Sequence, residues 1–308
     1  MRVRVIANPV AGSGKGTAIA DAVVAFLRQH GWQVEAAVTE APGHARAIVR
    51  EARASEVDAV VAVGGDGLVN EIINGPLDPE VALGVIPAGT GNVLARELGL
   101  PLRWRAAAES LLRSVAVRFD VGVANGRRFL LMLGVGWDAH LLEEVRRAPR
   151  PWLGIWQYVP AILRTAWQPH VYQFSVTADG EQRDSPGWML IAGNTNLYTW
   201  LFRPTPEASP ADGVLDFALL RGKGRLALTR ALLRSVARKT VCEREAVYFR
   251  AASAIVRTEP AAPFQVDGDL AGEAAVEISV EPRALRLLAP PEHLLARSAG
   301  DATEAGAR

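Results

Sequence analysis

Short apolar, β-branched runs alternate with helical patterns over the first third of the chain. The predicted strands cover residues 3–7, 34–38, 58–63 and 82–86, and the predicted helices cover 17–30, 43–53 and 68–74. Such alternation is typical of βαβ units with a parallel sheet. The run 58–63 is almost wholly apolar, as expected for a central strand covered on both faces. We therefore predict a three-layer α/β domain over residues 1–120.

After about residue 119 the pattern changes to strands at short intervals. The expected strands cover 119–124, 128–133, 172–178, 188–192, 215–220, 246–250, 254–257 and 275–280, with helical inserts at 152–167 and 225–238. This pattern predicts an antiparallel β-sandwich over residues 121–285. The fold class is therefore α/β plus all-β. Residues 286–308 form a C-terminal segment whose small, polar end, from 298 onward, we expect to be disordered.

Composition fits a globular protein with two domains. The chain has 308 residues, 49% hydrophobic and 22% charged. Its 34 basic and 33 acidic residues give a net charge of +1, so no global field would hold it on nucleic acid. The lone Cys242 is interpreted as a buried small hydrophobe. We see no signal peptide and no apolar run of the ~18–20 residues that span a bilayer, so we expect a cytoplasmic protein, peripheral at most.

Three glycine-rich turns follow predicted strands of the first domain. Such turns let backbone N–H groups converge on phosphate at the carboxyl edge of a parallel sheet. The first turn, residues 8–17, departs from a P-loop at Pro9 and Gly16. It is either a different anion cradle, with Lys15 close by, or a plain connection. The third turn, residues 87–92, ends in Asn92, which we interpret first as a helix N-cap.

The second turn, Gly64-Gly65-Asp66-Gly67, carries a carboxylate among its glycines, with Asn70 and Glu71 one helical turn further on. A carboxylate at this edge could position Mg²⁺ bridging the phosphates of a nucleotide. A structural turn explains the glycines but does not require the acid. Asp66 is therefore our leading catalytic candidate in the first domain.

The turns NPVAGSGKG, GGDGLVNEIINGP and PAGTGNVLARELGLP resemble, in this order, the diacylglycerol kinase catalytic family, which includes bacterial lipid kinases and sphingosine kinases. PEASPADGVL and QVDGD extend the resemblance into the second domain. The resemblance implies a nucleotide-binding first domain to which the C-terminal segment returns, with ATP and Mg²⁺ as cofactors. The candidate nucleotide-binding residues are Asn8, Pro9, Val10, Ala11, Gly12, Lys15, Thr39, Gly64, Gly65, Asp66, Gly67, Leu68, Val69, Asn70, Glu71 and Thr90.

The resemblance also assigns a metal site and a proton acceptor. Bacterial members place a structural Mg²⁺ at the segment matching Ser209, Asp212 and Val214. The family's acceptor lies in an Asp-Gly-Glu motif, which here reads Asp267-Gly268-Asp269. Asp269 is thus the candidate base, one methylene shorter than usual, and Asp267 is the second candidate. Val93 and the segment 198–201 also depart from the family pattern.

These features favour a lipid kinase that transfers the γ-phosphate of ATP to a hydroxyl of a membrane lipid. The segment 146–167 mixes arginines with Trp152, Trp156 and Trp167, which suits either a helix at an anionic membrane or a core helix. An NAD kinase-like enzyme with a soluble substrate, which shares the GGDG turn, remains an alternative, as does a nucleotide-binding regulator without activity. We expect no nucleic-acid partner, and the sequence leaves a homodimer open.

Overall fold

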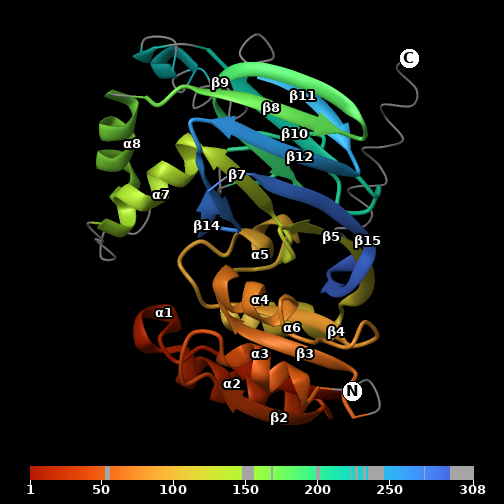
Figure 1. Ribbon diagram of the computed structural model, residues 1–308. Helices are drawn as coiled ribbons and strands as arrows, with labels where there is room; N and C mark the ends of the chain where they lie inside the picture. Colours follow the sequence, from red (N-terminus) through yellow and green to blue (C-terminus); the bar gives the residue numbers. More distant parts are fainter. Residues whose placement is uncertain are drawn as a thin grey trace. The chain divides into compact units, whose positions relative to one another are not determined.

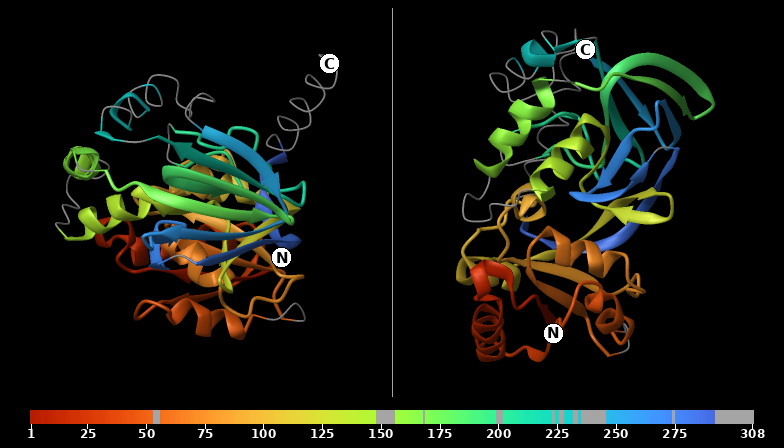
Figure 2. Two further views of the ribbon diagram at one scale, coloured as in Figure 1. Left: turned by 45° about the horizontal axis from the view of Figure 1, so that its top comes forward. Right: turned by 60° about the vertical axis from the view of Figure 1, so that its left-hand side comes forward.

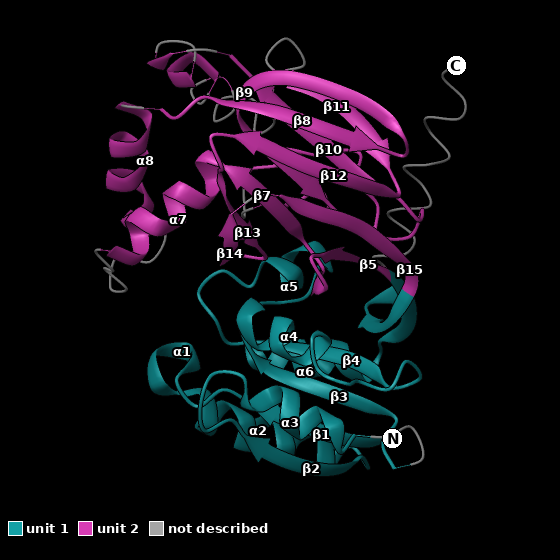
Figure 3. Ribbon diagram, in the orientation of Figure 1, with its two compact units in different colours: residues 1–119, 284–308 teal, residues 120–283 magenta. Residues whose placement is uncertain are grey.

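The computed structural model describes residues 1–52, 56–147, 156–167, 169–198, 202–222, 224–225, 228–231, 234, 246–273 and 275–291. The chain divides into two compact units, shown in different colours in Figure 3. Unit 1 comprises residues 1–119 and 284–308, and unit 2 comprises residues 120–283. Cys242 and the tail from residue 298 lie outside the described residues.

Unit 1 is built on a parallel sheet with the order β2-β1-β3-β4. Its elements are β1 Arg2–Ala7, α1 Ala11–Gly14, α2 Gly16–Gln29, β2 Gln33–Val38, α3 His44–Arg50, β3 Ala59–Gly64, α4 Asp66–Ile73, β4 Ala82–Pro87, α5 Val93–Glu97 and α6 Trp104–Leu112 (Figure 1). The end of β15, Val276–Ala289, adds a further parallel partner to β4 through Leu287 and Leu83.

Helices pack against the sheet of unit 1 through alternating strand residues. Val61 and Val63 of β3 join α2 and α6 in one buried cluster, whereas the intervening Val60 and Ala62 lie on the opposite face. All six residues of β3 are buried, which confirms the central strand predicted from its apolar run. Figure 2 shows helices on both sides of these strands, so the predicted three-layer arrangement is confirmed.

Unit 2 is an antiparallel β structure with two helices. Its strands are β5 Val115–Ala124, which begins in unit 1, β6 Arg127–Phe129, β7 Met132–Gly136, β8 Tyr172–Ala178, β9 Glu181–Gly193, β10 Leu215–Arg221, β11 Ala246–Ala251, β12 Ser253–Glu259, β13 Pro263–Val266 and β14 Asp269–Glu273; its helices are α7 Trp137–Arg147 and α8 Tyr158–Trp167. The strand order is β14-β13-β7-β9-β8-β12-β15, with β10 pairing with β9 and β11. Phe129, Phe174 and Phe217 are central to its core. The predicted fold class of the C-terminal domain, an antiparallel β-sandwich, is confirmed.

Three features of the fold differ from the sequence prediction. The expected strand 128–133 is two strands, β6 and β7, because the amides of Leu130 and Leu131 are bound by a side chain rather than by a neighbouring strand. Helix α6 and the β13–β14 hairpin were not predicted. Of the predicted helix 152–167, residues 152–155 lie outside the described residues, and the α-helix begins at Tyr158. Over the part of the chain that the structure describes, no helix combines the length and apolarity needed to cross a bilayer.

Candidate active site

The three glycine-rich turns of unit 1 meet at one edge of the sheet. A Cβ on Gly89 of the third turn would lie 2.6 Å from the Cα of Gly65 in the second. A Cβ on Gly12 of the first turn would lie 3.5 Å from the Ala88 carbonyl oxygen. The second and third turns are therefore in direct backbone contact, which a side chain at Gly89 would prevent, and the first turn lies beside the third. This is the juxtaposition that the order of the motifs predicts.

The first turn holds its shape through Asn8 and two glycines. The Asn8 side-chain oxygen accepts a hydrogen bond from the Val10 N–H at 3.1 Å. Gly16 packs so closely that a Cβ there would lie 1.9 Å from the Asn8 carbonyl oxygen. Gly12 has a φ of 60°, in the left-handed region that glycine adopts without strain. Val10 is 74% exposed, so this turn presents its outer surface to solvent.

Asp66 connects the second turn to the third. Its two carboxylate oxygens accept hydrogen bonds from the backbone N–H groups of Val93 and Leu94, each at 3.0 Å. These amides open α5, so Asp66 caps that helix from a distant part of the sequence. Its predicted part in handling Mg²⁺ stays a prediction. The contacts add a structural role that the sequence did not disclose.

Asn92 occupies the N-cap position of α5 without capping it. Its side chain turns back to Gly89 instead, accepting from the Gly89 N–H at 2.9 Å and donating to the Gly89 carbonyl at 2.7 Å. Its φ of 48° is left-handed, as asparagine tolerates. The interpretation of Asn92 as a capping side chain is thus wrong, because Asp66 already binds the first amides. Thr90 within the same turn is exposed.

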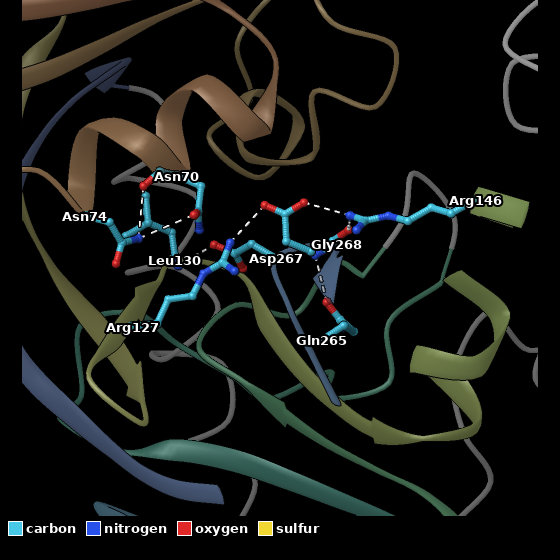
Figure 4. A network of polar contacts seen from close by, with 9 residues as sticks. Asn70, Asn74, Arg127, Leu130, Arg146, Gln265, Asp267 and Gly268 are labelled. Carbon is cyan, nitrogen blue, oxygen red and sulfur yellow. Dashed lines mark hydrogen bonds and ion pairs between the residues drawn. The ribbon is translucent and has the colours of Figure 1, made fainter. Parts of the chain in front are cut away.

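Other candidate nucleotide-binding residues stabilise the elements around the turns. The Thr39 hydroxyl donates to the Ala7 carbonyl at the end of β1, and a Glu71 carboxylate oxygen accepts from the Ala45 N–H of α3 at 3.3 Å. Asn70 is buried, and its carbonyl accepts from the Asn74 side chain at 2.9 Å, within and just after α4 (Figure 4). Leu68 and Val69 are also buried.

In unit 2, Asp267 and Gly268 form the two-residue turn between β13 and β14. Their φ values of 48° and 86° are both positive, as in a type I′ hairpin turn. The Asp267 carboxylate accepts three backbone N–H groups, from Leu130 at 2.9 Å and from Leu131 and Met132 at 3.0 Å. Asp267 therefore anchors the chain just before β7. Its carboxylate is engaged by the protein itself.

Asp269, two residues later, is placed differently. Its oxygens are each 2.8 Å from a guanidinium nitrogen, one of Arg127 on β6 and one of Arg146 on α7. Arg146 also donates to the Gly268 carbonyl at 3.3 Å. Figure 4 shows the two arginines approaching the turn from different elements. The Asp269 side chain is 47% exposed, so it remains accessible from solvent.

A hydrogen-bond chain through the buried side chains of Gln265 and Asp138 leads from the turn to α7. The Gly268 N–H donates to the Gln265 side-chain oxygen at 2.7 Å, and the Gln265 amide nitrogen donates to Asp138 at 2.7 Å. The Tyr198 hydroxyl donates to the other oxygen of Asp138. Burial raises the pKa of the Asp138 carboxyl, against the effect of these two donors. Sequence reasoning missed Arg127 and Asp138, because no motif marks them, and it gave Gln265 no role although Gln265 begins the QVDGD motif.

The predicted metal site contains a basic side chain. The Arg250 guanidinium contacts the Asp212 carboxylate and lies 3.5 Å from Asp216. Asp212 also accepts from the Val214 N–H at 3.3 Å. Carboxylates are suitable Mg²⁺ ligands, but Arg250 already supplies positive charge to both, so the arrangement fits a guanidinium rather than a metal ion. Among the described residues, no group of three or more His, Cys, Asp or Glu side chains is arranged to hold a metal.

Comparisons with known proteins cover both units. The family model described as the Diacylglycerol kinase catalytic domain matches residues 2–124, and that described as the YegS C-terminal NAD kinase beta sandwich-like domain matches residues 132–289. A diacylglycerol kinase of Mycobacterium tuberculosis is 30% identical over 296 residues, covering 94% of this chain and 95% of that protein. A diacylglycerol kinase of Bacillus subtilis is 27% identical over 274 residues, covering 88% and 90%.

A solved structure agrees in fold. The crystal structure of a diacylglycerol kinase from Bacillus anthracis has a TM-score of 0.74 and 23% identity to this chain, covering 94% of it and 97% of the solved chain. At that identity the likeness shows the fold alone. The family matches and the relatives aligned over nearly their whole length show, in addition, the family to which the chain belongs. The chain belongs to the diacylglycerol kinase catalytic-domain family of lipid kinases.

Proposed function

We propose that this protein transfers the γ-phosphoryl group of ATP, presented with Mg²⁺, to a hydroxyl of a membrane lipid. The observation that carries the proposal is the meeting of the three glycine-rich turns at one sheet edge, supported by family membership. Backbone amides gathered at such an edge suit the phosphates of a nucleotide. A kinase that uses ATP and a membrane lipid would work at the cytoplasmic face of the membrane.

Asp269 is the proposed proton acceptor. In the reaction, the lipid hydroxyl oxygen forms a bond to the γ-phosphorus, the bond from that phosphorus to the bridging β–γ oxygen breaks, and ADP leaves. The hydroxyl proton passes to the Asp269 carboxylate. Phosphoryl transfer depends chiefly on positioning and on charge neutralisation. The two arginines that hold Asp269 supply positioning, and its 47% exposure leaves it accessible. Asp267 is a weaker acceptor candidate, because three amides already bind it.

The direct test is product identification. Purified full-length protein is incubated with MgATP and, in separate reactions, diacylglycerol, a sphingoid base, phosphatidylglycerol, NAD or no acceptor, and products are identified by mass. We expect a phosphorylated lipid from the wild type and none from Asp269→Asn, with ATP binding retained by the variant. ATP turnover confined to the NAD reaction would instead support the NAD kinase-like alternative, which the sandwich-like C-terminal match favours. ATP binding without any product would indicate a regulatory protein.

A further inference from the structure

Helix α8 exposes an apolar face. Trp156, just before the helix, and Leu163 and Trp167 within it are 70%, 68% and 67% exposed, and Val159 is 44% exposed. Their spacing of three, four and four residues places them on one side of the helix. Ala161, on the other side, is buried, and α8 packs against α7. These four residues, called the α8 face below, are large hydrophobic side chains left in solvent.

Two described arginines, Arg164 and Arg225, lie beside the α8 face. Residues 145–178 include four arginines and no Asp or Glu, and residues 221–242 include seven Lys or Arg and no Asp or Glu. Arg225 of the second segment reaches the α8 face, because its guanidinium lies 5.0 Å from the centre of the Trp167 ring. Arg164, on the flank of the face, is 67% exposed and lies 3.8 Å from Glu144, whose side chain is only 20% exposed. The outward charge beside the apolar face is therefore positive.

We propose that the α8 face docks on an anionic lipid surface. Tryptophan is favoured at the boundary between water and hydrocarbon, because its large ring is apolar while its N–H remains hydrated. Flanking arginines add attraction to acidic headgroups, which extends over about one Debye length. An apolar helix face with basic flanks is typical of a helix lying in the membrane interface. The charge complementarity favours lipid over a neutral protein groove.

The docking proposal rests on the proposed function, since a lipid kinase must meet its acceptor at a bilayer. In this proposal the α8 face binds the membrane and takes no part in phosphoryl transfer. The face lies on α8 and the residue close before it, whereas the Asp267-Gly268-Asp269 turn joins β13 to β14. Substitutions on the face should therefore change where the enzyme works without changing what it does to an acceptor already in solution. That separation makes the proposal testable.

The test is vesicle flotation of the full-length protein without ATP or acceptor. Vesicles of phosphatidylcholine alone are compared with vesicles that also contain phosphatidylglycerol. We expect binding to the anionic vesicles only, reduced about tenfold in Leu163→Ala and further in Trp156→Ala/Trp167→Ala. Leu102→Ala is the matched control, because Leu102 is 41% exposed in unit 1 and undergoes the same chemical change. Arg164→Gln should weaken the dependence on anionic lipid.

The outcomes distinguish this proposal from the proposed function. Phosphorylation of a short-chain acceptor dispersed below its micelle concentration should be unchanged in Leu163→Ala, whereas phosphorylation in vesicles should fall with binding. Wild-type protein that ignores lipid charge, or Leu163→Ala that floats like the wild type, would overturn the docking proposal. So would loss of a dimer in Leu163→Ala with unaltered flotation, because the face would then join two copies. Absence of any phosphorylated lipid, with flotation as expected, would refute only the kinase assignment.

Discussion

Two aspartates of one hairpin should respond to the same substitution in opposite ways. Asp267 accepts three backbone N–H groups, whereas Asp269 makes two ion pairs at the surface. Asparagine keeps the size of both side chains and tolerates the left-handed conformation at position 267. The substitution therefore tests the charge and the lost acceptor oxygen with little change in backbone strain.

The expected magnitudes differ several-fold. A hydrogen bond to a charged group contributes about 1.5–3 kcal/mol, and such contributions are not additive. Asp267→Asn should therefore lower the free energy of unfolding by about 3 kcal/mol, which corresponds to a fall in Tm of about 6–12 °C for a domain of this size. Exposed ion pairs contribute ~1 kcal/mol or less. Asp269→Asn should accordingly leave Tm almost unchanged, yet reduce the rate of transfer by about 10²–10⁴-fold if it is the general base.

The assay combines thermal unfolding with phosphorylation measured well below the transition. We expect Asp267→Asn to be less stable but active per folded molecule, and Asp269→Asn to be stable but inactive. Arg128→Gln is a useful control, because Arg128 makes a surface ion pair with Glu281 instead of Asp269. A stable, inactive Asp267→Asn would reverse the two roles. An active Asp269→Asn would refute the assignment of the proton acceptor.

Four further changes test other parts of the structure. Asp66→Asn should lower the free energy of unfolding by ~1–2 kcal/mol through the lost charge at the start of α5, measured by urea titration. Gly89→Ala should weaken ATP binding at least tenfold, because a Cβ there would lie 2.6 Å from the Cα of Gly65, and equal ATP affinities for this variant and the wild type would contradict the prediction. Gly67→Ala should not lower the urea midpoint, because a Cβ there meets no atom within 4 Å beyond its chain neighbours and its own helix backbone. Burial raises the pKa of the Asp216 carboxyl to about 6 from 3.8. Between about pH 4 and pH 6 the folded state therefore binds more protons than the unfolded state, so this carboxyl makes the free energy of unfolding fall as the pH rises. Asp216→Asn should flatten this slope in Tm measurements across that range. EDTA should not change the Tm of the wild type, because Arg250 already neutralises Asp212 and Asp216. Without that guanidinium, Mg²⁺ should raise the Tm of Arg250→Met. A loss of stability of the wild type in EDTA would instead support the metal site predicted from the sequence.

The fold was largely predictable because the hydrophobic pattern has a clear period in each half of the chain. The β3 run of six buried residues and the amphipathic α2 illustrate this for unit 1. Strand β7 shows where the pattern fails. Its separation from β6 depends on Asp267, more than 130 residues away in sequence, and local periodicity carries no signal of so distant a partner.

Some residues of the candidate site could likewise be predicted from the sequence, and others could not. Glycines of the turns could be recognised because close backbone contact excludes other residues, as at Gly65 and Gly89. The partners of the carboxylates could not, because a sequence does not say whether an aspartate faces solvent, an amide or an arginine. Asp66 and Asp267 both proved to bind backbone amides, whereas Asp269 binds Arg127 and Arg146.

The path of β15 limits how this protein can be divided. Unit 1 is assembled from two separate segments of sequence, and its second segment contributes the end of β15, where Leu287 pairs with Leu83 of β4. A fragment that stops at residue 119 would lack this partner and leave β4 as an open edge, a common starting point for aggregation. A fragment that represents unit 1 should therefore join residues 1–119 to 284–291 through a short linker, so that β4 keeps its neighbour.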